Sequence, residues 1–231
     1  MIRILHLYPQ LMNLYGDYGN IVVLRRHLEE LGLEVQVDRK EPDDIFDPAD
    51  YDFIYMGSGT ENSQKVALRK LRRQADTLKF CLENDKVILF TGNAMELMGK
   101  QIDEEEGIGL LDFSVTTTEK RYTGDVILHN DQIGDVVGFI NKSSLIAGNR
   151  ENALFTYEFR DRNLVDNEFE GYRLKNLFGT HVIGPVLVKN PSFLDAIVAL
   201  LAGSSYRKIV FEHEEKAYET TLSELRKRKT E

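Results

Sequence analysis

The sequence predicts an α/β fold with three layers, a mainly parallel sheet with helices on both faces, plus an antiparallel section in the second half. Short apolar runs of strand length alternate with amphipathic helical segments up to Gly99, which is the pattern of βαβ units. Beyond Gly99, strand-like segments follow one another without long helices between them, as in antiparallel sheets. The lack of a flexible linker in the sequence favours one compact domain.

Strands and helices are expected in alternation over the first half. The first strand covers Ile2–Leu7, and turn-forming residues at 13–20 lead into a helix with Asn20 as its expected N-cap. Apolar residues at helical spacing then predict two helices, the first with Ile21, Leu24, Leu28 and Leu31, the second with Leu68, Leu71, Ala75, Leu78 and Leu82. Further strands are expected at 33–37, 53–56 and 87–90.

The second half is expected to be richer in strands. Alternating and β-branched residues predict strands at 112–118, 125–129, 136–141 and 153–157. Helical periodicity returns with Phe193, Ile197, Leu200 and Leu201. We therefore expect one domain over residues 1–203, followed by a charged, helix-prone extension over 204–231. That extension is either an added contact surface or a solvated helix.

Composition excludes several classes of partner. The formal net charge of -9 argues against nucleic acid or an anionic membrane surface as the main partner. No apolar stretch is long enough to suggest a signal peptide or a membrane span. The single cysteine, Cys81, fits a reducing cytoplasm. The five histidines lack metal-ligand spacing with another His, Cys or carboxylate, so no metal site is expected. No other cofactor is expected either.

The segment Val87–Gly99 has the pattern of a strand, a tight turn and a helix. Hydrolases and amidotransferases place a nucleophilic Ser or Cys at the tip of such a turn, but here the tip is Gly92. An ordinary βα turn is the other interpretation, because glycine is common where a helix packs close to a strand. Thr91 is one residue early, and Cys81 is expected near a helix C-terminus, where its thiol would be structural.

His181 is the histidine with a possible role in a site. It is expected at the end of a strand that runs into Gly184-Pro185, and α/β sites gather at strand C-termini. A hydrogen-bonded structural histidine is the alternative. The glycines around Asp17 lack the spacing of a phosphate-binding loop and are interpreted as turn formers.

Several motifs together resemble the class I glutamine amidotransferase-like proteins of the cobyric acid synthase type, and among them the glutaminase subunits of bacterial lipid II isoglutaminyl synthase. The resemblance extends to about residue 202. The motifs that carry it are Leu7-Tyr8-Pro9, Met12–Asp17, Gly19-Asn20-Ile21, Gly57-Ser58-Gly59, Gly107–Asp112, Glu170-Gly171, Asn176–Thr180, Gly184-Pro185 and Lys189-Asn190-Pro191.

The resemblance implies a glutaminase fold in which both catalytic groups are replaced. The elbow cysteine of the family falls on Gly92, and its histidine, which directly precedes Gly-Pro, falls on Ile183. His181 lies two residues away. The family's Gly-Phe-Glu-Asn-His segment reads Gly138–Lys142 here, so surrounding residues also differ. The resemblance places glutamine, or a related small molecule, in a vestigial pocket at Gly57, Ser58, Gly59, Asn93 and Ala94.

Three hypotheses follow. The first is a non-hydrolysing partner or regulatory subunit that forms a heterodimer with a Mur-ligase-like protein. The second is an active glutaminase that supplies ammonia for lipid II or cobalamin-type amidation from a non-standard site. The third is a different enzyme that has reused the elbow, with His181, Glu96 or Asn93 acting on another small substrate.

Overall fold

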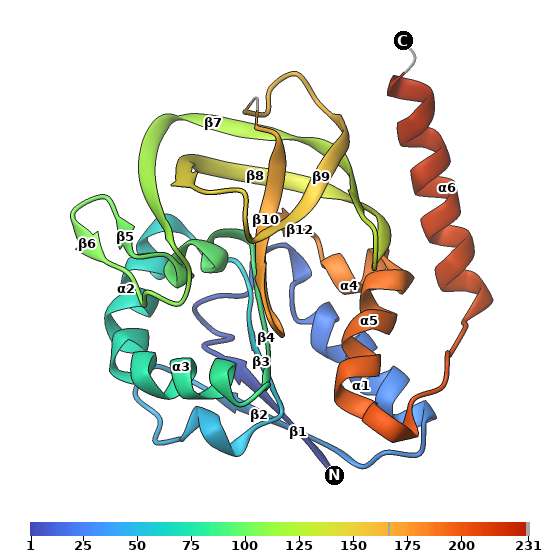
Figure 1. Cartoon of the computed structure of the whole chain (residues 1–231), viewed down its shortest axis with the longest axis horizontal. Coiled ribbons are helices and arrows are strands. Elements are labelled where there is room, and N and C mark those ends of the chain that lie inside the picture. Colours follow the sequence, from blue (N-terminus) through green and yellow to red (C-terminus); the bar gives the residue numbers. More distant parts are fainter. Residues whose placement is uncertain (166, 230–231) are drawn as a thin grey trace.

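One mixed sheet runs through the computed structural model, which describes residues 1–165 and 167–229 (Figure 1). Its strands lie in the order β12-β8-β7-β9-β10-β11-β4-β3-β1-β2. The half that ends in β2 is parallel and the half that ends in β12 is antiparallel, so the predicted fold class is confirmed.

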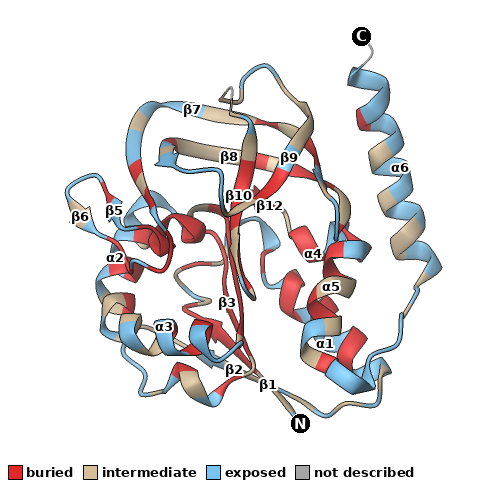
Figure 2. Cartoon of the chain, viewed as in Figure 1, coloured by how far each residue is buried: buried red, intermediate tan, exposed pale blue. Residues whose placement is uncertain are grey.

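The parallel half consists of five strands and the helices on its two faces. The strands are β1 (Ile2–Leu7), β2 (Val35–Lys40), β3 (Phe53–Met56), β4 (Val87–Thr91) and β11 (Leu177–Thr180). One face carries α2 (Glu61–Leu71) and α3 (Ala75–Glu83). The other carries α1 (Gly19–Glu30), α4 (Val186–Lys189) and α5 (Pro191–Ala202). Figure 2 shows that β3 and β4 are buried, as expected for strands covered on both faces.

The antiparallel half is dominated by a long hairpin that curls over the end of the parallel strands (Figure 1). Its register shifts between Thr117 and Tyr122, where the ladder is irregular. The strands of this half are β7 (Phe113–Asn130), β8 (Gly134–Gly148), β9 (Ala153–Arg160), β10 (Phe169–Leu174) and β12 (Val182–Ile183). A small hairpin of β5 (Gln101–Ile102) and β6 (Glu105–Glu106) joins the edge of β7.

Five short 3-10 helices in the described part of the chain connect these strands and helices. They are η1 (Leu14–Gly16), η2 (Pro48–Asp50), η3 (Arg72–Gln74), η4 (Gly92–Met98) and η5 (Gly203–Ser205). No helix within the described ranges is both long and apolar enough to cross a membrane.

Three local expectations were wrong. The second long helix is two helices, α2 and α3, with η3 between them. The strands expected at 112–118 and 125–129 are one strand, β7. Asn20 is not an N-cap, because the helix begins at Gly19 and the Asn20 side chain is buried. Its amide instead accepts a hydrogen bond from the Leu187 N–H (2.8 Å) and donates one to the Tyr55 hydroxyl (2.8 Å).

The C-terminal extension folds back as α6 (Glu212–Lys229), which lies beside the antiparallel strands (Figure 1). Only Leu225 of this helix is buried, in a small cluster with Ile127 and Val137. Its last turn is tied to the strands by ion pairs, of Arg226 with Asp135 and Glu158 and of Arg228 with Asp125 and Asp161. The domain boundary at residue 203 stays a prediction, and residues 230–231 of the expected extension lie outside the described residues.

Replacement of Asn190 by alanine should lower the free energy of unfolding by about 2–4 kcal/mol. The fully buried Asn190 amide accepts from the Val137 N–H (2.7 Å) and donates to the carbonyls of Val137 (2.9 Å) and Val186 (2.8 Å), so it joins β8 to α4. Urea unfolding followed by circular dichroism measures the change. The exposed Asn62→Ala variant is the matched control, and equal stabilities of the two variants would contradict this role.

Candidate functional site

The turn between β4 and η4 has the backbone shape of a nucleophile elbow. Gly92 stands at its tip with φ +60, in the left-handed region that glycine adopts without strain. Nucleophile elbows place their Ser or Cys in such a strained turn between a strand and a helix. The helix here is a 3-10 helix, Gly92–Met98, that ends before Gly99.

Two side chains crowd the tip of the elbow. A Cβ atom on Gly92 would lie 2.5 Å from both Cβ and Oγ of Ser58 and 3.0 Å from Cγ2 of Ile183. The fold therefore brings together Gly92 and Ile183, the two positions that the resemblance assigns to nucleophile and histidine. Neither carries a group that could attack a carbonyl or move a proton, and Ser58 occupies the space that a nucleophilic side chain would need.

The loop after β3 is locked to the elbow by Asn93. The Asn93 amide accepts from the Gly59 N–H (2.9 Å) and the Ser58 hydroxyl (3.2 Å), and donates to the Gly59 carbonyl (2.9 Å). All three residues line a cavity of about 260 Å³ beside the elbow. Gly57 and Ala94, also predicted to bind a ligand, do not line this cavity: Gly57 packs against Asp17 and Ala94 lies in the core.

Polar side chains of both charges surround this cavity. At its edge, Arg121 and Glu61 form an ion pair (2.5 Å), and Arg121 also donates to the Asn141 side chain (2.9 Å). Lys142 and Glu96 line the cavity as well. A zwitterionic amino acid would find partners here for its ammonium and for its carboxylate.

Asp17 lies beneath the elbow and is fully buried. Its Oδ2 accepts from the Ser58 N–H (2.7 Å) and the Thr91 hydroxyl (3.3 Å), whereas its Oδ1 has no hydrogen-bond partner. Burial raises the pKa of Asp17 to about 6, against the opposing hydrogen bonds from Ser58, Thr91 and the Gly184 N–H. Thr91 is thus turned inward, toward Asp17 and the Tyr55 hydroxyl (3.0 Å), and away from a ligand.

His181 is held between two buried glutamates. Its Nδ1 is 3.2 Å from Oε1 of Glu170, and its Nε2 is 3.3 Å from Oε1 of Glu96. Glu96 also accepts from the Ser144 hydroxyl and the Gln64 amide, and Glu170 from the Thr180 hydroxyl.

This arrangement keeps both glutamates ionised. Burial raises the pKa of each, but hydrogen bonds to His181 and the charge on its ring outweigh burial and leave both pKa values below the usual range. A carboxylate only accepts hydrogen bonds, so each ring nitrogen of His181 faces an acceptor. Both nitrogens are thereby occupied, as in the structural interpretation of His181.

The two groups that organise this region, Asp17 and Glu170, were not predicted as site residues. Asp17 was interpreted as part of a turn, and Glu170 only as part of a motif. The sequence does indicate a special role for Glu96, because it is a charged residue between Met95 and Leu97 in an otherwise apolar run. Cys81 is fully buried in α3, and burial raises the pKa of its thiol to about 11. In the described part of the chain, no group of three or more His, Cys, Asp or Glu residues could hold a metal ion.

Comparison with known proteins gives a family match and two curated relatives. Residues 3–191 match the family of CobB/CobQ-like glutamine amidotransferase domains. The GatD subunit of the glutamine-hydrolysing lipid II isoglutaminyl synthase of Staphylococcus aureus is 32% identical, over 85% of this chain and 83% of that protein. The GatD subunit from Streptococcus pneumoniae is 29% identical, over 96% of this chain and 88% of that protein.

Solved structures share the fold at low sequence identity. A crystal structure of a glutamine amidotransferase aligns with a TM-score of 0.58 and 14% identity, covering 86% of this chain and 98% of the other. A glutamine amidotransferase from Thermotoga maritima aligns with a TM-score of 0.56 and 14% identity, covering 98% and 97%. These likenesses show the fold alone.

The stability of the protein should depend on pH through Asp17. Between about pH 4 and pH 6 the folded state keeps a proton that the unfolded chain has lost, so raising the pH through this window lowers the free energy of unfolding, by about 3 kcal/mol at most. Comparison with Asp17→Asn isolates this contribution, because the variant lacks the titrating group. Parallel pH profiles of native protein and variant in urea unfolding would refute the assignment.

Removal of the His181 ring should leave two buried carboxylates without their shared partner. We expect His181→Ala to lower the free energy of unfolding by about 3–5 kcal/mol. A second change, Glu96→Gln, removes one of the two charges, so the double variant should lose less stability than the sum of the single variants. Additive losses in urea unfolding would show that His181 and Glu96 do not interact.

Proposed function

Because the chain belongs to the family of CobB/CobQ-like glutamine amidotransferase domains, we propose that it is an amidotransferase-like subunit that binds glutamine, or a related small molecule, without hydrolysing it. In this proposal it acts as a partner or regulatory subunit of a Mur-ligase-like protein in the cytoplasm. The amidotransferase-like domain covers residues 1–203, and 204–231 is its extension.

The crowding at Gly92 is the observation that carries this proposal. The elbow keeps its positive φ and its cavity, yet Ser58 and Ile183 fill the space where a nucleophile and its base would act. Loss of a nucleophile lowers the rate of a triad enzyme by roughly a million-fold, and further losses add little. Hydrolysis by the family's route is therefore not expected.

The remaining candidates for a nucleophile or base are all engaged elsewhere. Thr91 is buried and bonded to Asp17 and Tyr55. Cys81 is buried in α3 with a raised pKa, which opposes thiolate formation. His181 has both ring nitrogens directed at glutamates. The alternative of an active glutaminase rests on the general likeness to glutamine-hydrolysing relatives and would need a nucleophile outside this set.

The cavity supports retained binding of an amino acid. Its size of about 260 Å³ suits a small ligand, and Glu61 and Arg121 present opposite charges at its edge. Ser58 and Asn93 supply hydroxyl and amide groups at the elbow end, where the side-chain amide of glutamine would lie.

A partner protein is supported by exposed apolar side chains next to the cavity. Leu14 and Tyr15 line the cavity edge, and Tyr18 and Val22 continue the exposed apolar surface along α1. Val188 of α4 is also exposed, and α4 packs against α1 near Gly19. Both curated relatives are named as subunits of a synthase. A partner docked over this surface would also cover the cavity mouth.

The test measures ammonia release and binding separately. Purified protein, alone and with its Mur-ligase-like partner, should release no ammonia from L-glutamine above the blank, while calorimetry detects glutamine binding. Asn93→Ala should weaken that binding by roughly tenfold, because it removes amide contacts that shape the cavity. Asn62→Ala, on the exposed face of α2, is the control.

A reconstructed elbow supplies the positive control. Gly92→Cys with Ile183→His leaves Ser58 in contact with the new side chain, so we expect activity only when Ser58→Gly is added. Ammonia release by the native chain would contradict the proposal. If that release survived Thr91→Ala and Cys81→Ala, the active-glutaminase alternative would hold with a nucleophile elsewhere.

A further inference from the structure

A second cavity, of about 300 Å³, lies on the other side of the Glu96–His181 pair from the elbow. It opens to the surface and is lined by residues of β8, β9 and β10 and by Met95 of η4, with His181 and Glu170 among them. Among the described residues, Lys142 alone lines both this cavity and the one beside Gly92. We infer that this second cavity binds a small monocarboxylic acid with an apolar body, a site separate from the proposed glutamine pocket.

The walls of the cavity suit the apolar part of such a ligand. Met95, Ile146 and Phe169 present apolar surface, and Tyr157 adds an aromatic ring. A branched or aromatic ligand body of about four to eight carbons would bury apolar surface against these walls. This burial would supply most of the binding free energy.

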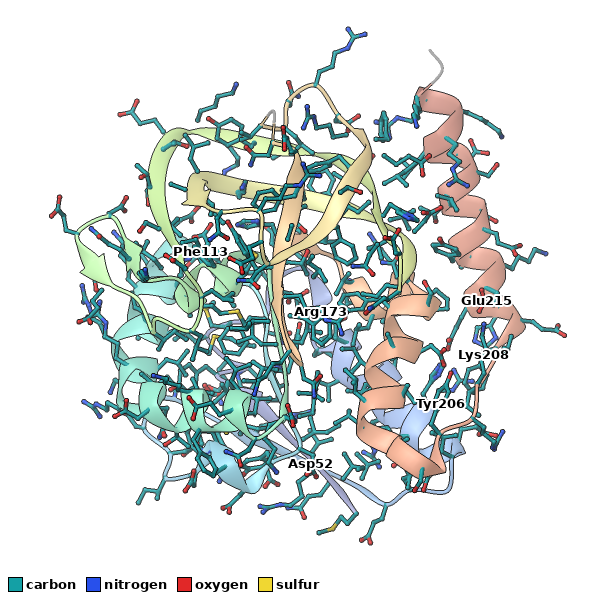
Figure 3. All side chains as sticks on the ribbon, viewed as in Figure 1. Asp52, Phe113, Arg173, Tyr206, Lys208 and Glu215 are labelled. Atoms are coloured by element: carbon teal, nitrogen blue, oxygen red, sulfur yellow. The ribbon has the colours of Figure 1, made fainter. Side chains whose placement is uncertain are left out.

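Tyr172 supplies a fixed donor without a partner. Its side chain is 3% exposed, and its hydroxyl makes no hydrogen bond. The ring is held in place by Phe113, stacked at 4.7 Å and labelled in Figure 3, and by Phe169, edge-on at 5.4 Å. Gly148 lies against the hydroxyl, and any larger residue there would collide with it. A buried hydroxyl left unbonded costs stability, so it is a group that an acceptor on a ligand would satisfy.

Lys142 supplies the charge. The residue is half-buried, and its ammonium lies near Glu96 and Glu170 but forms no hydrogen bond or ion pair with any residue in the described ranges. Burial lowers the pKa of Lys142, and the two carboxylates only partly oppose this. A ligand carboxylate would accept from Lys142 and from Tyr172, and charge-assisted hydrogen bonds of this kind are the stronger ones.

The carboxylates of the cavity, by contrast, have their partners. Glu170 accepts from the Thr180 hydroxyl and from the backbone and ring of His181. Glu168 is paired with Arg150. An amine ligand would therefore find occupied acceptors, whereas a carboxylate finds free donors. This difference selects an acid over an amine of the same shape.

Titration with 4-methylpentanoate, and with 4-methylpentanamide and 4-methylpentylamine as matched probes, tests the inference by calorimetry or ligand-observed NMR. The acid should bind at least about tenfold more tightly than either probe. Tyr172→Phe should weaken acid binding by roughly tenfold without loss of thermal stability, because the hydroxyl it removes is unbonded. Lys142→Met should weaken it at least as much.

The competing outcomes are distinct. Equal binding of acid, amide and amine, or unchanged affinity in both variants, would overturn the inference, as would no binding of the acid up to about 10 mM. Asn93→Ala separates this site from the proposed function, because it should weaken glutamine binding and leave binding of 4-methylpentanoate unchanged. Loss of both bindings in Asn93→Ala would mean that the two cavities are one site.

Discussion

The carboxylate of Asp17 is the point at which three segments at the carboxyl edge of the parallel strands meet a fourth segment that follows β12. Asp17 follows β1, and it receives hydrogen bonds from Ser58 after β3, Thr91 at the end of β4 and Gly184 after β12. These loops lie at the carboxyl edge of the strands, where α/β proteins place their sites. The position of the elbow relative to its neighbours thus depends on one buried group, and the unsatisfied Oδ1 shows that this positioning has a cost in stability.

A second buried polar centre divides the space under the curled hairpin. Glu96, His181 and Glu170 come from η4, the segment after β11 and β10, so their ion pairs connect both halves of the sheet. Buried ion pairs of this kind contribute little net stability but fix the geometry of what surrounds them. Here they separate two cavities that differ in character. The one beside Gly92 is bounded by the elbow and the loop after β3, and the one against β10 mixes polar groups with the aromatic rings of Tyr157, Phe169 and Tyr172.

The sequence predicted those parts of the fold that depend on local pattern. The apolar runs of β3 and β4 predicted buried parallel strands, because a strand covered on both faces is mostly apolar. Gly92 was identified as the tip of the turn from its position directly after the β4 strand. Contacts between residues that are distant in the chain could not be predicted from local pattern. Nothing local to Asn20 indicates Leu187, and nothing local to His181 indicates Glu96, so the roles of both side chains were assigned only by the structure. The length of β7 was also missed, because its middle is exposed and polar.

The contact between Gly92 and Ser58 has an evolutionary consequence. A cysteine that arises at position 92 by itself meets the Ser58 side chain. A glycine that arises at position 58 by itself removes the hydroxyl bonded to Asn93 and gains nothing in return. A side chain at position 92 therefore requires a change at position 58 as well, so no single substitution at the elbow introduces one without a clash.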